Sequence, residues 1–160
     1  MLDVPVGTAV FTWKKYAEMQ ADIICLDYSE DMLEQAKARF AKAGLDGIKT
    51  LQGDVGNLPF ADETFDIVLS MNGFHAFPDK DKAFLETNRV LKKGGFFIST
   101  FYIKDKSKIT DMLINKVFAK KGWFTPPFET EWSLKNRLEK MYHIKEFHVK
   151  GSMVYFLVEK

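Results

Sequence analysis

The stretch Leu2-Asp3-Val4-Pro5-Val6-Gly7-Thr8-Ala9-Val10 places an apolar strand end, an acidic residue and a tight turn of small residues before an amphipathic segment at 11–20. This order predicts a strand, a turn and a helix. The first backbone N–H groups of a helix have no intrahelical partner, and small side chains let a ligand approach the main chain closely. We therefore expect this junction to suit a flat, nucleoside-type ligand.

Composition and charge limit the class of protein. With 160 residues, 46% of them hydrophobic and 14% aromatic, the chain can bury one sizeable core, so we expect a single domain over 1–160. Residues 1–100 hold 11 basic and 15 acidic side chains, and residues 101–160 hold 12 and 7. The acidic first part suits a neutral or cationic ligand, and no dense basic stripe indicates a nucleic-acid partner.

The sequence gives no sign of a metal, a disulfide or a membrane span. The single cysteine, Cys25, lies in an apolar run, which indicates a buried strand residue, and the three histidines show no metal-ligand spacing. Without a signal peptide or an apolar run that could span a bilayer, we expect a cytoplasmic protein with no membrane partner. Only two apolar residues precede Asp3, so we also expect a natural segment upstream of Met1.

Short apolar runs alternate with segments of helical periodicity along the rest of the chain. We expect strands at 22–27, 48–51, 65–70, 96–103, 144–149 and 153–158, and helices from Ser29 to Gly44, from Asp79 to Leu91 with a stop at Gly94-Gly95, at 108–121 and at 133–142. In the helix at 108–121, the residues expected to face the core are Ile109, Met112, Leu113, Val117 and Phe118. This alternation predicts a doubly wound, mostly parallel α/β sheet with one reversed strand near an edge.

Acidic residues end the first three predicted strands, at Asp3, Asp27 and Asp54. Ligands of such sheets bind beyond the carboxyl ends of the strands, at the point where the strand order reverses. A carboxylate there can accept two hydrogen bonds from a ribose diol, and another can accept from an exocyclic amine beside a backbone N–H. Each aspartate alone is an ordinary turn or cap residue. Three on one sheet edge predict a site for an adenosyl group.

These segments resemble the motifs of the class I S-adenosylmethionine-dependent methyltransferases of the small-molecule type. The resemblance covers nearly the entire chain and rests on Leu2 to Ala9, Cys25-Leu26-Asp27-Tyr28-Ser29-Glu30-Asp31-Met32, Gly53-Asp54-Val55 with Leu58-Pro59-Phe60, Phe65-Asp66-Ile67-Val68, and Val90-Leu91-Lys92-Lys93-Gly94-Gly95. It implies a Rossmann-like, three-layer αβα fold whose seven-stranded sheet has the order 3-2-1-4-5-7-6.

The resemblance also implies S-adenosyl-L-methionine as the cofactor and assigns the residues that hold it. Asp3, Pro5 and the Gly7 turn would hold its amino acid portion, and Asp27 its ribose hydroxyls. The remaining implied contacts are Asp54 and the Val55 amide on adenine, Tyr28 and Met32 along the adenine face, and Asn72 beside the methionine.

The first motif departs from the family pattern, which has glycines where Pro5 and Ala9 stand. Proline cannot take a positive φ and has no N–H to donate. Ala9 adds a methyl group where the backbone must approach the ligand. Both changes bear on the affinity and the pose of the cofactor.

Methyl transfer from a sulfonium is an in-line displacement, so the protein mainly has to align the reactants and exclude water. His75, in the loop after the fourth strand, is our candidate for deprotonating or orienting an acceptor hydroxyl or amine. It is equally compatible with a residue that only lines the pocket. Four aromatic residues could form a wall for an aromatic or apolar small-molecule acceptor, or could equally belong to the core. They are Trp123, Phe124, Phe128 and Trp132.

Two alternatives remain open at this stage. The first is a degenerate module that binds S-adenosylmethionine without turnover, which the altered first motif would suit. The second is a nicotinamide-dependent oxidoreductase, which needs a glycine-rich turn for pyrophosphate that Pro5 and Ala9 disrupt. Methyltransferases of nucleobase amino groups have a proline-rich aromatic tetrapeptide where this chain reads Ser70-Met71-Asn72-Gly73, so that subclass is disfavoured.

Overall fold

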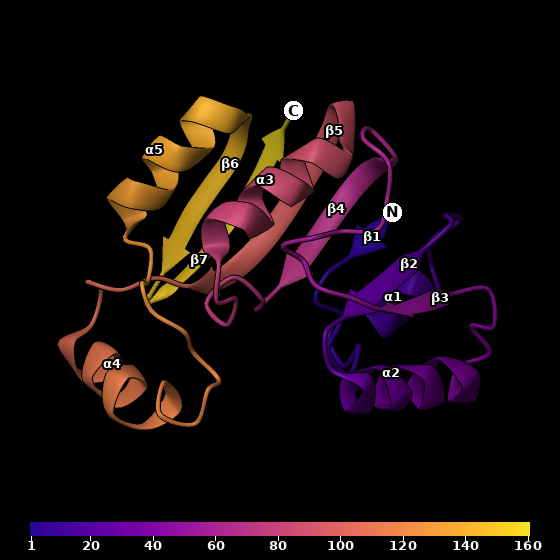
Figure 1. Cartoon of the computed structure of the whole chain (residues 1–160), viewed down its shortest axis with the longest axis horizontal. Coiled ribbons are helices and arrows are strands. Elements are labelled where there is room, and N and C mark those ends of the chain that lie inside the picture. The colour runs from indigo at the N-terminus through magenta and orange to yellow at the C-terminus, as the bar shows by residue number, and fades with distance from the viewer.

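The computed structural model describes all 160 residues and contains one seven-stranded sheet of order β3-β2-β1-β4-β5-β7-β6 (Figure 1). The strands are β1 (Leu2–Asp3), β2 (Ile24–Asp27), β3 (Lys49–Gln52), β4 (Phe65–Met71), β5 (Leu91–Tyr102), β6 (His143–Lys150) and β7 (Met153–Glu159). All neighbouring pairs from β3 to β5 are parallel, and β7 runs antiparallel to both β5 and β6. The predicted fold class and strand order are confirmed.

Helices connect the strands on both sides of the sheet. They are α1 (Trp13–Tyr16), α2 (Glu30–Lys42), α3 (Lys80–Val90), α4 (Lys108–Leu113), which continues into the π-helical segment η1 (Ile114–Phe118), and α5 (Glu131–Met141). The three longest helices begin at side-chain caps: Ser29 accepts from Met32 N, Asp79 from Lys82 N, and Thr130 from Ser133 N. Their starts therefore lie within two residues of the predicted positions.

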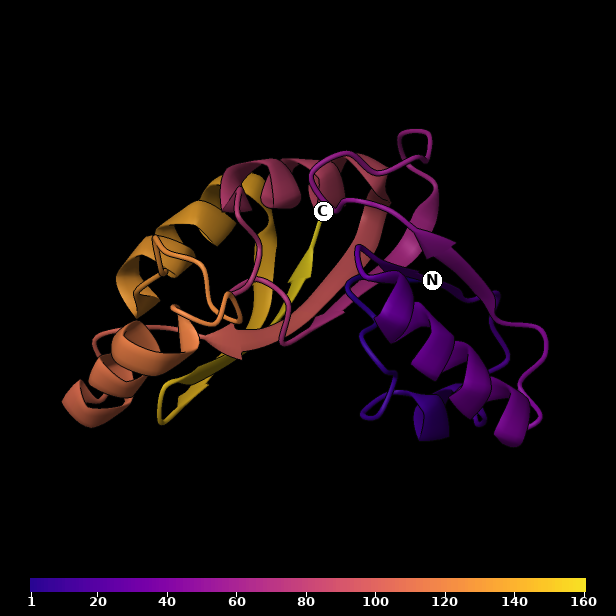
Figure 2. The same ribbon diagram turned by 60° about the horizontal axis from the view of Figure 1, so that its bottom comes forward.

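Two hydrophobic cores lie on opposite faces of the sheet. Cys25 of β2 packs with Leu33, Ala36 and Phe40 of α2, whereas the next residue, Leu26, belongs to the larger core on the other face. Figures 1 and 2 show α3 and α5 together over the face formed by β4, β5 and β7. The larger core therefore supports the long strands, and the smaller one supports the turn after β1.

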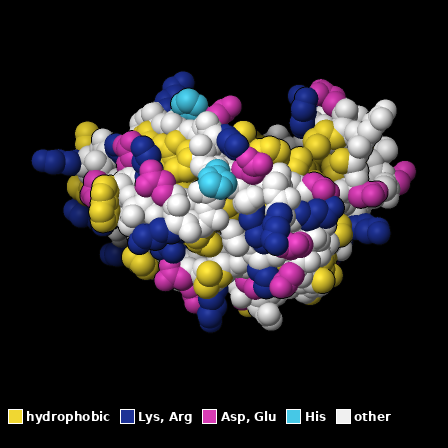
Figure 3. Space-filling model, turned by 90° about the horizontal axis from the view of Figure 1, so that it is seen from above, with side chains coloured by type: hydrophobic (Ala, Val, Ile, Leu, Met, Phe, Trp, Pro, Cys, Tyr) yellow, Lys and Arg dark blue, Asp and Glu magenta, His cyan; other side chains and the backbone are white.

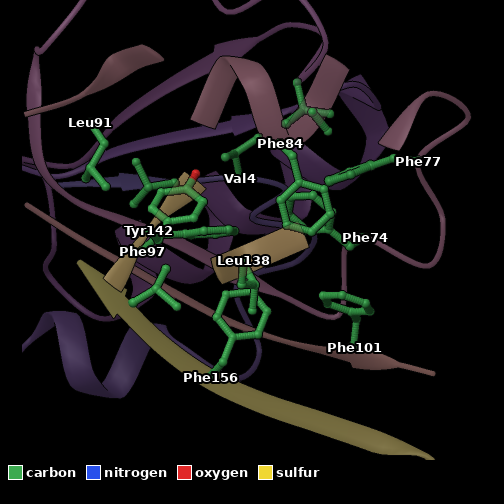
Figure 4. Packing of buried hydrophobic residues seen from close by; sticks show 14 of the residues in the cluster. Val4, Phe74, Phe77, Phe84, Leu91, Phe97, Phe101, Leu138, Tyr142 and Phe156 are labelled. Atoms are coloured by element: carbon green, nitrogen blue, oxygen red, sulfur yellow. The ribbon is translucent and has the colours of Figure 1, made fainter. Parts of the chain in front are cut away.

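An aromatic cluster fills the larger core, centred on Phe74 (Figure 4). Its ring centroid lies 4.3 Å from that of Phe84 on α3, and 5.7 and 5.4 Å from those of Phe97 and Phe101 on β5. Phe74 comes from the loop that follows β4. The cluster thus anchors this loop at the carboxyl edge of the sheet.

Three local predictions were wrong. The segment at 11–20 forms only the short helix Trp13–Tyr16, and the segment at 108–121 changes from α to π geometry at Ile114. The helix before Gly94-Gly95 ends at Val90, and both glycines lie inside β5. A Cβ on Gly95 would lie 2.9 Å from the carbonyl oxygens of Asp66 and Lys92, so the glycine allows β5 to pass close to the backbone of β4.

The apolar side of the segment at 108–121 also differs from its prediction. Ile114 is the buried residue of this segment, and Ile109, Met112, Leu113 and Val117 are exposed. α4 makes its main contacts with η1 rather than with the sheet. Helical spacing of apolar residues indicates a shared side of the helix, but it does not say whether that side meets the core.

The turn after β1 and the loop after β4 pack closely against each other. A Cβ on Gly73 would lie 2.2 Å from Cδ of Pro5 and 2.8 Å from both Pro5 Cγ and Phe77 Cζ. The proline ring therefore fits only because residue 73 has no side chain. The two loops that border the carboxyl edge are held together at this contact.

Gly73→Ala is expected to lower the free energy of unfolding by roughly 1–3 kcal/mol, because the added methyl group overlaps the Pro5 ring. Urea denaturation of G73A, Pro5→Gly and the double variant measures the coupling. In the P5G background the alanine should cost less, since only the Phe77 overlap remains. Strictly additive effects would contradict this packing.

Candidate functional site

The carboxyl ends of β1 and β4 border a cavity of about 240 Å³. Because β1 lies between β2 and β4, the cavity sits where the order of the parallel strands reverses, which is the usual ligand site of such sheets. Larger grooves beside α5 are lined mainly by polar and charged side chains. The cavity is lined by Asp3, Pro5, Val6, Gly7, Thr8, Val10, Phe11, Thr12, Met32, Met71 and Asn72.

Asp3 is a buried carboxylate with one unsatisfied oxygen. Its Oδ2 accepts hydrogen bonds from the Tyr16 hydroxyl and from Thr12 Oγ1. Its Oδ1 has no partner, although the residue is only 1% exposed and lines the cavity. Burial raises the pKa of Asp3 to about 7, against the two hydrogen bonds, and the charge of Asp27 raises it slightly further. A cationic group in the cavity would satisfy this oxygen.

Asp27 joins the turn after β1 to the end of β2. Its Oδ2 accepts from Gly7 N at 2.7 Å, and its Oδ1 accepts from Ser29 N at 3.0 Å. Each carboxylate oxygen can accept more than one hydrogen bond, so both retain capacity for a ligand hydroxyl. Asp27 is not among the residues that line the cavity. Its visible role is to fix the backbone on which the turn is built.

Asp54 and Val55 follow β3 with free hydrogen-bonding groups. Asp54 is exposed, and its Oδ1 accepts from Gly56 N at 2.8 Å. The N–H of Val55 donates to no protein group, and Oδ2 of Asp54 has no donor. An acceptor and a donor are thus available on adjacent residues, which is the pattern that an adenine edge requires.

The other predicted contacts are divided between the cavity and its surroundings. Pro5, Gly7, Met32 and Asn72 line the cavity, and Met32 remains partly exposed there. Tyr28 is strongly exposed and lies outside the lining. The structure therefore gathers the residues predicted to hold the amino acid portion of a ligand, together with Met32 from the predicted adenine face, and it leaves Tyr28 and Asp54 on the exposed surface.

Sequence reasoning missed two residues that position Asp3. Thr12 and Tyr16 both donate to its Oδ2, and both are buried. The signal that could have found them was the hydroxyl of Tyr16 on the apolar side of the segment at 11–20. A tyrosine hydroxyl that is buried needs a hydrogen-bond partner. The structure shows that this partner is Asp3, 13 residues earlier in the chain.

Ala9 takes a backbone conformation that favours glycine. Its φ is +55° and it is buried, and Gly7 has the same φ. This left-handed region strains a residue that bears a Cβ. The turn therefore keeps its shape at the expense of local strain.

His75 lies in the loop that follows β4 and is not part of the lining of the cavity. Its Nδ1 accepts from Tyr102 N at 3.3 Å, and its ring stacks on Phe124 with centroids 4.1 Å apart. Burial, helped by the charge of Lys80, lowers the pKa of His75 to about 4. At neutral pH the imidazole is uncharged and, with Nδ1 accepting, its proton resides on Nε2.

The four aromatic residues considered as a wall for the acceptor differ in their exposure. Phe124 and Phe128 pack edge-on against Tyr102, with centroids 5.6 and 5.4 Å away, and are half-buried beside His75. Trp123 and Trp132 are exposed. Only the two phenylalanines are therefore placed to form an apolar wall near His75.

Comparison with known proteins agrees with this geometry. A family model described as a methyltransferase domain matches residues 2–99. Demethylmenaquinone methyltransferase of Staphylococcus epidermidis is 39% identical over 99 residues, which are 61% of this chain and 40% of that protein. An uncharacterized methyltransferase of Bacillus subtilis is 30% identical over 115 residues, which are 72% of this chain and 45% of the relative. The matched part of the chain thus spans less than half the length of these relatives.

Solved structures show the same fold over a larger share of the chain. The crystal structure of a putative methyltransferase from Bacillus halodurans superposes with a TM-score of 0.80 and 27% sequence identity. The superposition covers 92% of this chain and 64% of that one. Since the family model matches more than half of the residues, this chain belongs to the methyltransferase domain family.

Proposed function

We propose that this chain binds S-adenosylmethionine and transfers its methyl group to a small-molecule acceptor. The observation that carries the proposal is the unpartnered Oδ1 of Asp3, a buried carboxylate oxygen lining a cavity at the strand reversal. The ammonium group of the methionine portion has the charge and the donors that this oxygen needs. When bound, the cofactor supplies an activated methyl group on a positively charged sulfur.

The groups left free at the carboxyl edge fit the rest of this ligand. The two oxygens of Asp27 keep capacity for the ribose hydroxyls while they hold Gly7 and Ser29. The acceptor of Asp54 and the N–H of Val55 match the amine and the ring nitrogen of adenine. The ammonium group, the ribose hydroxyls and the adenine of the ligand therefore each have a complementary group in this chain.

The chain's own contribution to the reaction is alignment and exclusion of water. Asn72 borders the cavity on the side of the loop after β4, next to Met71. We infer that His75 orients the acceptor by donating from Nε2–H, because Nδ1 already accepts from Tyr102 N. With its pKa near 4, this side chain is neutral and holds its proton throughout the neutral range.

The names of several relatives support an apolar acceptor for this chain. Several similar proteins are named demethylmenaquinone methyltransferases. Phe124 and Phe128 offer an aromatic wall beside His75, which suits a ring-containing or apolar molecule. We therefore propose an acceptor of this chemical class.

Calorimetric titration with S-adenosylmethionine, its demethylated product and NAD tests the proposal. The first two ligands should bind and NAD should not. Asp27→Ala should weaken cofactor binding by roughly 1–3 kcal/mol, because the ribose hydroxyls lose their acceptor. Asp66→Ala, an exposed carboxylate at the opposite end of β4, is the matched control and should leave binding unchanged. Equal affinity of D27A and the parent would remove Asp27 from the site.

Cofactor affinity is expected to fall by about fivefold from pH 7 to pH 6, a range in which the ligand's α-amino group stays protonated, because the ammonium group binds the ionised form of Asp3, whose pKa is about 7 in the free protein. Binding should therefore release protons, measurable by calorimetry in buffers of different ionisation enthalpy. Asp3→Asn should remove this dependence, and so should a ligand without the amino acid portion, 5′-methylthioadenosine. A pH-independent affinity for the parent protein would contradict the role of Asp3.

Substitutions at His75 distinguish a hydrogen-bond donor from a general base. Turnover of demethylmenaquinone should fall at least about tenfold in His75→Ala but only a few-fold in His75→Gln, because the glutamine amide can donate as Nε2–H does. Cofactor affinity should stay unchanged in both variants. Equal losses in H75A and H75Q, with a pH profile that follows a histidine, would indicate a base instead. Cofactor binding without transfer to any acceptor would favour the binding-only module, which the strained turn at Ala9 also suits.

A further inference from the structure

Five large apolar side chains are exposed on one segment at the carboxyl edge. Four of them lie along α4 and η1, and the fifth is Trp123, shortly after η1. Ile109 is 76% exposed, Met112 51% and Trp123 56%. We call the set the apolar ridge; its members are Ile109, Met112, Leu113, Val117 and Trp123.

The ridge is the outer side of a segment whose inner side is fixed. Ile114 is buried, and Asp111 accepts from the Tyr102 hydroxyl at 2.6 Å and from Asp105 N at 3.0 Å. Positions 109, 112, 113 and 117 share one side of a helix, roughly opposite to these contacts. The ridge is therefore directed to solvent by the way the segment is attached.

The segment that carries the ridge also carries lysines without ion-pair partners. The segment 104–123 contains six lysines and two aspartates, and one of those aspartates is engaged by Tyr102. Nζ of Lys121 lies 4.8 Å from the centroid of the Trp123 ring. The lysines of this segment that are exposed and form no ion pair are Lys108, Lys116, Lys120 and Lys121.

An exposed segment that carries both apolar and basic side chains matches an anionic lipid surface. The apolar groups enter the boundary between headgroups and acyl chains, the lysines pair with anionic headgroups, and tryptophan is favoured at that depth. An acidic protein surface would satisfy the lysines but would leave the apolar ridge against polar groups. The charge and the apolar area together therefore favour lipid.

The ridge lies on the same side of the molecule as the candidate site. α4 follows the carboxyl end of β5, and Figure 2 shows α4 and α1 at the two ends of one side of the molecule. Val10 and Phe11, which line the cavity, are also exposed. Figure 3 shows the face on which β7 ends, and there acidic and basic side chains are interspersed.

We propose that the apolar ridge docks this protein onto an anionic lipid bilayer, with the carboxyl edge of the sheet turned toward the membrane. This attachment is peripheral, since no helix has the length and hydropathy needed to cross a bilayer. The expectation of no membrane partner rested on that same lack of a spanning segment, which does not bear on surface binding. The inference stands on the ridge and its lysines and does not depend on the proposed methyl transfer.

Co-sedimentation with vesicles of phosphatidylglycerol and phosphatidylcholine in equal parts tests the docking. The protein should bind these vesicles and bind pure phosphatidylcholine at least about tenfold less. Raising the salt from about 0.1 M to about 1 M shortens the Debye length from about 10 Å to about 3 Å and should release most of the protein. Equal binding to both kinds of vesicle, or to neither, would overturn the proposal.

Variants at exposed positions locate the contact without disturbing the core. The double variant Ile109→Glu/Met112→Glu should bind the anionic vesicles at least about tenfold less. Leu85→Glu, at a residue 62% exposed on α3, is the matched control and should bind as the parent does. Circular dichroism checks that all variants are folded.

A second pair of variants tests the lysines. Lys116→Gln/Lys120→Gln should weaken binding at least about fivefold, whereas Lys42→Gln/Lys93→Gln, which removes two exposed lysines elsewhere, should not. Loss of binding in the control pair alone would overturn the assignment to the ridge. A second outcome would also overturn it. If the parent protein binds no vesicles but forms a dimer in ultracentrifugation, and the double glutamate variant abolishes that dimer, the ridge joins two copies of the chain.

Discussion

The carboxylate of Asp27 is the constraint on which the candidate site depends. It accepts hydrogen bonds from backbone N–H groups on both sides, one from the turn after β1 and one from the start of α2. Hydrogen bonds to a charged acceptor are stronger than neutral ones, and the bond from Gly7 joins segments twenty residues apart. Val6 and Ala9 of the turn are buried in the smaller core, but Gly7 has no side chain to pack, so this carboxylate fixes the position of the glycine. The cavity has a defined shape because its floor is held in this way.

The turn shows how an altered motif is accommodated. Pro5 carries a ring into a space that is open because residue 73 is glycine, so the lost flexibility on one loop is matched by a missing side chain on the other. Ala9 has no such relief and holds a φ of +55°. Strain of this kind persists only where the surroundings fix it, here burial and the hydrogen bonds from Thr12 N and Trp13 N to the Ala9 carbonyl. Pro5 and Ala9 therefore differ in their physical consequences, although the family resemblance leads us to expect glycine at both positions.

The sheet could be predicted from the sequence because each piece of evidence was local. Buried strands appear as apolar runs, and the caps at Ser29 and Asp79 mark helix starts through side chains that bond within three residues. The strand order came from crossover rules and from the family resemblance. The position of Asp3 at the carboxyl edge followed from the same reasoning. The missing hydrogen bond of Asp3 could not be predicted from the sequence, because it depends on which donors reach a buried oxygen atom.

The errors arose where tertiary contacts decide the outcome. Gly94 and Gly95 follow a helix, which is typical of a stop signal, but the close approach of Gly95 to the Asp66 carbonyl shows that they serve the pairing of β4 with β5. The tautomer of His75 depends on Tyr102 N, a backbone group 27 residues away, so no local pattern reveals it. The spacing in the segment at 108–121 correctly indicated a shared apolar side, but it revealed neither the π geometry from Ile114 onward nor the exposure of that side.

The exposure of that side follows from the balance of forces on α4 and η1. The segment is attached through Ile114 and the bonds of Asp111, and turning its apolar side inward would remove these contacts and bury Lys116 and Lys120 with it. Burying an unpaired ammonium group costs several kcal/mol, more than an exposed leucine or methionine would gain by burial, about 1.5–3 kcal/mol. A lipid surface removes this conflict, because the apolar side chains reach hydrocarbon while each lysine stays among anionic headgroups, gaining about 1 kcal/mol. Neither contribution alone holds a protein of this size at a bilayer, so attachment by both is reversible and sensitive to salt.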